Sequence, residues 1–390
     1  MSTTNRRVRV RFGRPASRFA AVVAAVAGAA LAIAACGSSS NNSSSSGGVN
    51  WATVSSVQAG GGMNALIAAA KKEGTLNVIT LPPTWANYGT IISDFTKKYG
   101  IKINSENPNG SSADEIQAVQ QLGQQSRAPD VLDIGLSYAL EYSDLFAPYK
   151  VATWNSIPAV NKATNGEWFA DYGGYVSIGC DTKIVKVCPT SFKDLLNPQY
   201  KNMVALDGNP TEANAAFSAV WAAALASGGS FTDIKPGLDF FKKLKAIGNF
   251  NPTAVTPATI QSGQTPITLD WDYLNVSASQ VVKHLFKFTV AVPTDASYAS
   301  YYVQAINKNA PDPAAARLWE EFLYSPEGQN LWLEGAARPI ELQTLVKDGT
   351  VDKVAYAALP TANPNVKYPT EAQITAAKAL VAQDWAAAVS

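Results

Sequence analysis

The sequence predicts an α/β protein of two lobes, each with a mostly parallel sheet flanked by helices. Two observations lead to this prediction. Short apolar segments of strand length alternate with segments of helical periodicity, and the joins between them are short. The alternation starts near residue 63 and starts again near residue 172. We therefore expect two lobes joined by two crossings of the chain, near residues 165–172 and 288–293, which together form a hinge.

The first 35 residues have the composition of an export signal. Six arginines and no acidic residue accompany an apolar segment at residues 19–35, and small residues lie directly before Cys36. We interpret residues 1–35 as a signal peptide. The small residues before the cysteine resemble a bacterial lipobox, which implies a diacylglycerol on Cys36. An uncleaved anchor is the alternative, but 17 mostly alanine residues are short for a span of about 20 strongly apolar residues.

Residues 36–60 are predicted to be a flexible tether, since residues 37–50 are rich in serine, glycine and asparagine without apolar periodicity. Six of the 31 basic residues lie in the leader, so the remaining chain has 25 basic and 30 acidic residues. It has no basic stripe, which argues against nucleic-acid binding, and no apolar segment long enough for a transmembrane helix. We expect a monomer held by lipid at the outer face of the cytoplasmic membrane or in the periplasm.

Helices and strands alternate through the first half. Two helical segments end at Gly74 and Gly100, which are helix stop signals. A third begins with Ser112 and Glu115, at the spacing of a capping box. The predicted helices are residues 63–74, 87–100 and 111–123, and the predicted strands are residues 76–80, 101–107 and 128–135.

The second half repeats this pattern. A long alanine-rich helix has Pro210 near its start, and a strongly amphipathic helical pair follows the last strands. The predicted helices are residues 191–202, 210–229, 237–248 and the pair 312–335, and the predicted strands are residues 172–181, 203–208, 266–271, 288–293 and 303–307.

Cys180 and Cys188 have seven residues between them. Thiols outside the cytoplasm oxidise readily, so we expect a disulfide that closes this short loop. The spacing does not fit a C-x-x-C redox motif, and the single histidine lies too far away to support a metal site.

Five segments resemble one known family when taken together and in order. They are "LIAAAKKEG", "DFTKKYGIKI", "APDVLDI", "SFKDLLNPQYKNMVALDG" and "NKNAPDPAAARLWEEFLYSPEGQNLW". Over residues 63 to about 340 the chain resembles the extracellular solute-binding proteins of ABC importers, in the group that takes up polyamines, ferric iron, thiamine or phosphonates. The resemblance implies a periplasmic-binding-protein-like fold of type II. It also implies closure of two lobes on a solute without catalysis or cofactor, and delivery to a membrane permease.

With this fold, lobe 1 is expected to comprise residues 61–168 and 289–337, and lobe 2 residues 169–288 and 338–390. Ligands of open α/β sheets bind beyond the carboxyl ends of strands, where this sequence has many aromatic and acidic residues. The candidate ligand-binding residues are Trp85, Tyr88, Ser137, Tyr138, Asp207, Asp270, Trp271, Asp272, Tyr301 and Tyr302.

Each candidate also has a structural interpretation. Trp85 can cover a loop, Tyr138 can lie in the core, and Asp207 can cap the following helix. The Tyr301–Tyr302 pair can pack at a strand edge. In an extended strand Asp270 and Asp272 point to the face opposite Trp271, so only one of these sets faces a cleft unless the strand has ended.

Aromatic rings beside carboxylates favour an organic cation as the solute. The polyamine-binding members of the family match best, at Trp85, Tyr88, Tyr138, Asp207 and Trp271, although their late carboxylate falls at or near Tyr302. Thiamine also fits stacked aromatic rings, and a sugar is a further alternative. Ferric iron fits less well, because the tyrosine pair of the iron binders lies elsewhere. A phosphonate needs anion donors, and arginine is scarce after the leader.

An enzyme is the main rival class. The sequence has no G-x-S-x-G, no P-loop, no H-E-x-x-H and no dinucleotide-binding fingerprint. We therefore expect no catalytic residues, no metal site and no cofactor. A glycosidase that uses a pair of carboxylates stays open as an alternative.

Overall fold

The computed structural model describes residues 48–293, 295–363 and 366–390. The predicted signal peptide and the predicted lipid attachment at Cys36 therefore lie outside the described residues. Among the described helices, none is both long enough and apolar enough to cross a membrane.

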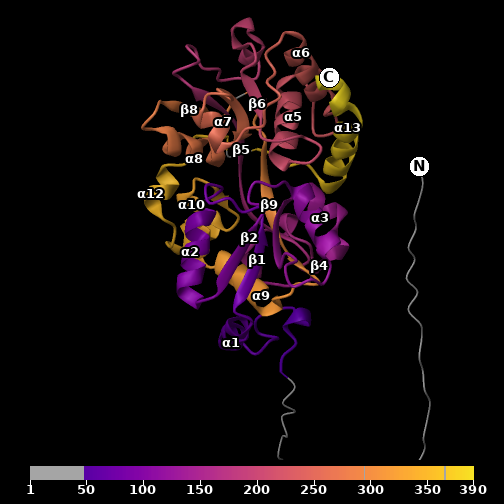
Figure 1. The fold of residues 1–390 in the computed structure, drawn as a ribbon, viewed down its shortest axis with the longest axis vertical. Helices are drawn as coiled ribbons and strands as arrows, with labels where there is room; N and C mark the ends of the chain where they lie inside the picture. Colours follow the sequence, from indigo (N-terminus) through magenta and orange to yellow (C-terminus); the bar gives the residue numbers. More distant parts are fainter. Residues whose placement is uncertain (1–47, 294, 364–365) are drawn as a thin grey trace, which may run out of the picture. The chain divides into compact units, whose positions relative to one another are not determined.

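Strands and helices alternate along residues 48–390, which confirms the α/β class (Figure 1). The strands are β1 (Thr75–Ile79), β2 (Lys102–Glu106), β3 (Val131–Gly135), β4 (Phe146–Ala147), β5 (Phe169–Asp181), β6 (Val204–Leu206), β7 (Ile267–Trp271), β8 (Phe288–Ala291), β9 (Ala299–Asn307) and β10 (Arg338–Pro339).

Thirteen α-helices are found in the described residues. They are α1 (Met63–Glu73), α2 (Tyr88–Tyr99), α3 (Ser112–Leu122), α4 (Leu136–Glu141), α5 (Asn214–Ala226), α6 (Lys235–Ala246), α7 (Pro257–Gln261), α8 (Asp272–Val282), α9 (Pro313–Leu323), α10 (Pro326–Glu334), α11 (Leu342–Asp348), α12 (Lys353–Ala357) and α13 (Glu371–Val389).

Local sequence explains most of the boundaries and some of the differences from prediction. Gly74 and Gly100 end α1 and α2 in the left-handed conformation, as the sequence predicted. The capping box of α3 uses Ser111 and Asp114, one residue earlier than the predicted pair. The predicted helix at 191–202 is instead two short 3₁₀ turns, and α5 begins at Asn214 rather than near residue 210.

The sheets are mixed rather than mostly parallel. β1 pairs with β2 in parallel, and the larger sheet has the order β3-β9-β5-β7-β6. Only β6–β7 is a parallel pair in this larger sheet, whereas β9 is antiparallel to β3 and β5, and β5 is antiparallel to β7. The long strands β5 and β9 lie in the middle of the sheet and run against their neighbours, which produces the antiparallel pairs.

Two groups of elements lie on either side of these central strands (Figure 1). We call β1–β3 with α1–α4 and α9 group 1, and β6, β7 and α5–α8 group 2. β5 connects the two groups. Its residues up to Tyr175 pair with β9, which pairs with β3 of group 1, and its residues from Val176 pair with β7 of group 2. The partner changes a few residues after the predicted crossing at 165–172. The two lobes and their hinge remain a prediction.

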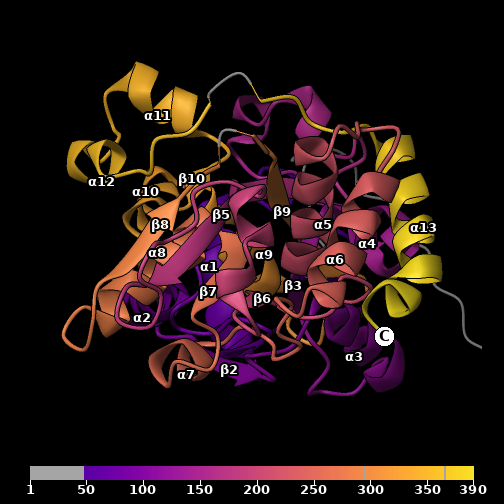
Figure 2. The same ribbon diagram turned by 90° about the horizontal axis from the view of Figure 1, so that it is seen from above.

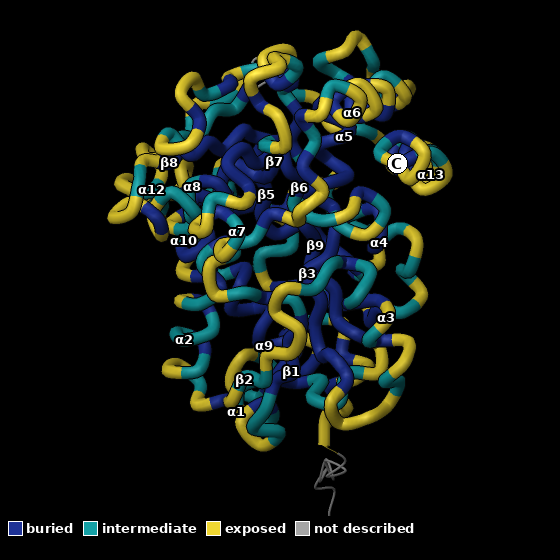
Figure 3. The backbone as a smooth tube through the Cα atoms, turned by 45° about the horizontal axis from the view of Figure 1, so that its top comes forward, coloured by how far each residue is buried: buried dark blue, intermediate teal, exposed yellow. Residues whose placement is uncertain are grey.

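β5 is buried along its full length, and the strands beside it form the interior shown in Figure 3. Two glycines allow its close contacts. A Cβ on Gly173 would lie 2.2 Å from the carbonyl oxygen of Ser300, and one on Gly174 would lie 2.4 Å from Oδ1 of Asp272. The backbone of β9 and a side chain of α8 therefore approach β5 at distances that only glycine permits.

Residues 48–60 pack on the body, whereas the predicted flexible tether included them. Trp51 is buried, and its ring lies against Gly60. The buried Arg317 donates from Nε to the carbonyl oxygen of Val54 at 2.9 Å and from an Nη atom to that of Ala52 at 3.1 Å. These bonds fix the segment because the guanidinium needs acceptors in the interior.

The disulfide between Cys180 and Cys188 is present, as predicted, with a Cα–Cα distance of 5.9 Å. It links the end of β5 to the loop that follows. Closing this loop limits the conformations of the unfolded chain, which stabilises the folded state.

The C-terminal helix α13 packs beside both α4 and α6 (Figure 2). Trp385 contacts Phe241 and Phe250, with ring centroids 5.3 and 6.1 Å apart. Near the middle of the helix, Lys378 forms an ion pair of 2.6 Å with Glu141 of α4. The sequence did not predict this helix, which contacts elements of both groups.

Replacing Trp385 with alanine should lower the free energy of unfolding by about 3 kcal/mol, because a buried indole leaves a cavity against α6. Chemical denaturation measured by circular dichroism tests this. Tyr356→Ala is the matched control, since Tyr356 is 43% exposed and its loss should cost about 0.5 kcal/mol or less. Equal losses in the two variants would show that α13 is not anchored through its indole.

Candidate functional site

A cavity of about 290 Å³ lies between group 1 and group 2. Its wall comes mainly from the ends of strands and the loops that follow them. From group 1 and β9 the wall includes Thr80, Pro82, Thr84, Trp85, residues 108–112, Asp114, Glu115, Asp133 and Tyr302. From group 2 it includes residues 207–209 and 212–215, residues 254–257, Ile260, Asp270, Leu274, Ser277, Ala278, Val281 and Val282.

Carboxylates dominate the polar part of this wall. The acidic side chains are Asp114, Glu115, Asp133, Asp207, Glu212 and Asp270. No lysine, arginine or histidine is among the described residues that line the cavity. When these groups are ionised, the potential inside is negative, which attracts cations and repels anions.

Asp207 and Asp270 lie next to each other at the carboxyl ends of β6 and β7. The register of this parallel pair places Leu206 opposite Leu269, so the next residue of each strand is one of these aspartates. Neighbouring strands are about 4.8 Å apart. Burial raises the pKa of Asp207 to about 7. Burial also raises the pKa of Asp270, and the charge of Asp207 raises it further. Both carboxyl groups therefore lose their protons at a higher pH than an exposed aspartate does.

Asp133 of β3 lines the cavity from group 1. It is 6% exposed, and its Oδ1 accepts no hydrogen bond from the described residues. Its other oxygen, Oδ2, accepts a 2.8 Å bond from the hydroxyl of Tyr172, which in turn accepts a 2.6 Å bond from Nε1 of Trp85. Burial raises the pKa of Asp133 to about 6. Hydrogen bonding to the Tyr172, Tyr88 and Asp171 side chains offsets part of this rise in pKa, so the carboxyl group has polar neighbours behind the cavity wall.

Aromatic rings surround this carboxyl group. Trp85 and Tyr302 both line the cavity, and their rings meet edge to face with centroids 5.6 Å apart. Behind them, Tyr302 stacks on Tyr172 at 5.9 Å, and Trp85 meets Tyr273 at 6.3 Å. The packed rings hold the two that face the cavity in fixed orientations.

Four of the ten predicted ligand residues line the cavity, namely Trp85, Asp207, Asp270 and Tyr302. Asp207 therefore faces the cavity, and Trp85 faces it while also donating a hydrogen bond behind the wall. The other six residues do not line the cavity. Their positions are described in turn below.

Tyr88 and Tyr301 are held by neighbours outside the cavity. Tyr88 is fully buried in α2, and its hydroxyl accepts a 3.1 Å bond from Nε2 of Gln304. Tyr301 lies 5.6 Å from the ring of Tyr368 in the C-terminal segment.

Tyr138 and Ser137 are buried in α4. The hydroxyl of Tyr138 is 3.0 Å from the carbonyl oxygens of Thr211 and Glu212, and Nζ of Lys378 lies 3.6 Å from the centre of its ring. Tyr138 therefore connects group 1 to the loop before α5, and its ring face is covered by a cation of the protein itself.

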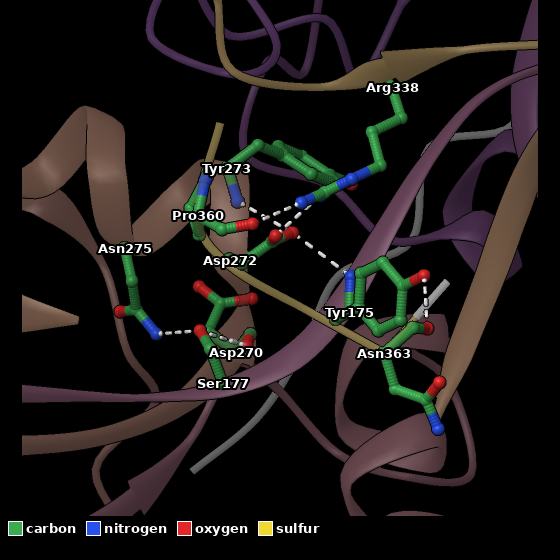
Figure 4. Close-up of polar contacts among 9 residues, drawn as sticks. All are labelled: Tyr175, Ser177, Asp270, Asp272, Tyr273, Asn275, Arg338, Pro360 and Asn363. Carbon is green, nitrogen blue, oxygen red and sulfur yellow. Dashed lines mark hydrogen bonds and ion pairs between the residues drawn. The ribbon is translucent and has the colours of Figure 1, made fainter. Parts of the chain in front are cut away.

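The strand β7 ends at Trp271. Figure 4 shows Asp270 and Asp272, the two aspartates on either side of this residue. Asp270 faces the cavity, Trp271 is buried, and Asp272 starts α8. Asp272 pairs with Arg338 through Oδ2 at 2.5 Å and accepts the N–H of Tyr175 at 2.9 Å. The strand has therefore ended before Asp272, which is the case that the sequence analysis left open.

The Arg338 pair joins the C-terminal segment to β5. The guanidinium lies 4.8 Å from the ring of Tyr175 and donates to the carbonyl oxygen of Pro360 at 2.8 Å (Figure 4). The guanidinium charge of Arg338 is therefore neutralised by Asp272, and Arg338 does not line the cavity.

The sequence did not single out Asp114, Glu115, Asp133 or Glu212 as candidate site residues. One signal for Asp133 was present, because an acidic residue inside an otherwise apolar strand has to be satisfied by a partner or a ligand. Glu115 was assigned to a helix cap, whereas its Oε2 accepts the backbone N–H of Asp133 at 3.1 Å. Among the described residues, no group of three or more His, Cys, Asp or Glu side chains is placed to hold a metal ion.

Solved structures with the same fold bind chemically different ligands. Iron-bound HitA from Pseudomonas aeruginosa is 19% identical with a TM-score of 0.56, covering 79% of this chain and 97% of its own. AfuA from Actinobacillus pleuropneumoniae, with fructose-6-phosphate bound, is 16% identical with a TM-score of 0.62, covering 81% and 98%. A putative spermidine/putrescine ABC transporter from Listeria monocytogenes is 14% identical with a TM-score of 0.54, covering 80% and 98%.

These likenesses show a shared fold and confirm the periplasmic-binding-protein-like architecture. The chain matches no curated protein sequence. Its residues 131–364 match the family model described as bacterial extracellular solute-binding protein. Because this match spans more than half of the 390 residues, the chain belongs to the bacterial extracellular solute-binding protein family.

Proposed function

We propose that this protein captures a small organic cation in the acidic cavity and delivers it to the permease of an ABC importer. One observation supports the cation above all: six carboxylates line the cavity, and no described basic side chain lines it with them. Buried carboxylates without counter-charges cost free energy. A bound cation supplies the missing charge, whereas an anion adds to the repulsion.

The rings of Trp85 and Tyr302 favour an organic cation over an inorganic one. A cation against an aromatic face gains about 0.5–2 kcal/mol, whereas micromolar affinity requires about 8 kcal/mol. Ring contacts alone are therefore too weak, and the solute has to use carboxylates as well.

These carboxylates come from both sides of the cavity. Asp133 belongs to group 1, and Asp207 and Asp270 follow strands of group 2. A solute with two amino groups, such as a polyamine, would contact both sides at once. Such bridging contacts favour a closed arrangement, because they form only when the two sides are close together.

The relatives do not decide the solute, since similar folds carry different ligands. Proteins of similar fold include a ferric binding protein, a periplasmic thiamin binding protein and a putative spermidine/putrescine ABC transporter. The cavity itself favours a cation, and thiamine, a flat cation, is our second candidate because it can stack on Trp85. A phosphorylated sugar is disfavoured by the acidic wall. We propose that the solute is bound and released unchanged.

A panel of solutes tests the proposed charge selection. Spermidine and thiamine, as cations, should raise the melting temperature of the purified protein, while fructose 6-phosphate and glucose should not. A ligand at 100 times its dissociation constant stabilises the folded state by about 2.7 kcal/mol. Differential scanning fluorimetry measures the shift. Stabilisation by the anion with no response to either cation would refute the proposal.

Trp85→Ala should weaken binding of the stabilising cation about tenfold, a loss of roughly 1.4 kcal/mol, because one aromatic face is lost. Trp85→Phe should retain most of the affinity. Trp154→Ala is the matched control, because Trp154 is also partly buried and has a cation against its ring, Lys162 at 4.5 Å, but does not line the cavity. Isothermal titration calorimetry measures all three. An unchanged affinity in Trp85→Ala would remove this ring from the binding site.

We also propose that Cys36 carries a lipid and that the following residues tether the body to the membrane. Cys36→Ser should move the protein from the membrane fraction to the soluble fraction after cell lysis, because the acyl chains are the proposed anchor. Immunoblots of the two fractions, with the wild type alongside, test this. Retention of the variant in membranes would contradict the lipid anchor.

A further inference from the structure

The Asp207–Asp270 pair has few stabilising partners. The carboxylate of Asp270 accepts a 2.7 Å bond from the N–H of Trp271, while burial is the cause that raises the pKa of Asp207. The two residues are adjacent across a parallel strand pair and open onto the same cavity. Two carboxylates that share one site cannot both ionise at the ordinary pKa of aspartate.

The groups that face this pair are acidic or neutral. Tyr302 of β9 and Tyr273 of α8 lie close enough for the aspartates to raise their pKa values. Asp133 of β3 and Glu212 of the loop before α5 line the same cavity. Arg338, near the start of α8, is paired with Asp272. A second negative charge on the aspartate pair therefore has no counter-charge among the described residues around it.

Asp133 lines the same cavity, and no hydrogen bond of good geometry reaches its Oδ1 from the described residues, although Tyr88 and Asp171 lie near its carboxyl group. The side chain of Asp133 is 6% exposed. A buried carboxylate oxygen without a donor is costly in the empty protein. An ammonium group, which has three N–H donors, satisfies such an oxygen. The cavity is thus arranged for a donor that carries positive charge.

We propose that Asp207 and Asp270 hold one proton between them while the cavity is empty, and that an arriving cation displaces it. This inference rests on the proposed function. No covalent bond to the solute forms. The O–H bond of the protonated carboxyl breaks, its proton passes to water, and the electron pair stays on the carboxylate, which then faces the ammonium group. Capture of the solute and release of one proton are a single equilibrium.

This coupling fixes the sign of the pH dependence. Below the raised pKa of the pair, the cation competes with a proton, so its affinity falls by about tenfold for each pH unit and each proton released. Above that pKa the affinity no longer changes with pH. The empty protein behaves in the opposite way. Since the folded pKa values are raised, its stability declines as the pH rises from the unfolded value of aspartate, about 3.9, through the folded value.

Calorimetric titration with spermidine and with thiamine, in phosphate and in Tris at one pH near 7, measures the released protons. Amines with a pKa near 10 stay charged at this pH. Because the two buffers differ in ionisation enthalpy, the observed heat should differ by an amount that corresponds to about one proton. In Asp207→Asn/Asp270→Asn the heat should become independent of the buffer. Asp348→Asn, at an exposed position of α11, is the control and should release protons like the wild type.

The outcomes separate the two proposals. Binding of a cation with the same heat in both buffers would overturn the shared proton and leave the cation-binding function intact. Failure of both cations to bind would overturn both.

A ligand-free measurement guards against a variant that does not fold. In the wild type labelled with ¹³C at aspartate carboxyls, a signal assigned to Asp207 or Asp270 should titrate above pH 6. Titration of both assigned signals below pH 5 would overturn the shared proton without reference to any ligand.

Discussion

A carboxylate that leaves water for a protein interior loses hydration that the protein has to replace with hydrogen bonds or opposite charge. Around the cavity this replacement is incomplete. Asp272 forms an ion pair with Arg338. Asp133, by contrast, has one oxygen that accepts no hydrogen bond from the described residues, and Asp207 and Asp270 lie beside each other without a counter-charge. The empty site therefore has a raised free energy that protons relieve in part. A positively charged solute relieves more of it, and this charge imbalance is the basis of the selectivity we propose.

The sheet determines where these groups meet. β5 pairs with β9 in its first half and with β7 in its second half, so residues of both groups are aligned on one strand. Gly173 and Gly174 let backbone and side chains from both sides approach it closely. Asp270 thus comes within the same cavity as Asp133, although the two residues are far apart in the sequence. The aromatic layer of Tyr172, Tyr273 and Tyr302 fills the space behind the acidic wall.

Local sequence patterns predicted most helices and strands, because periodicity and glycine stop signals act over a few residues. They predicted that Asp207 and Asp270 follow strands, but strand direction depends on partners far along the chain, so the antiparallel pairs were missed. Asp272 does not line the cavity, and nothing local in the sequence marks the change from β7 to α8 that places it beside Arg338. Asp133 was overlooked since its role depends on a cavity formed by distant loops. Tyr138 has the residue type expected of a ligand, yet its hydroxyl and ring are already in contact with Thr211, Glu212 and Lys378.

The helix α13, at the chain end furthest in sequence from the first strands, connects α4 to α6. Trp385 is packed on α6 and Lys378 is paired with α4. A movement that separated α4 from α6 would break the ion pair between Lys378 and Glu141 or expose the indole of Trp385 to water. The ease of such a movement would then depend on contacts that lie outside the cavity, remote from any solute. A protein fused to the last residue would act on the same helix.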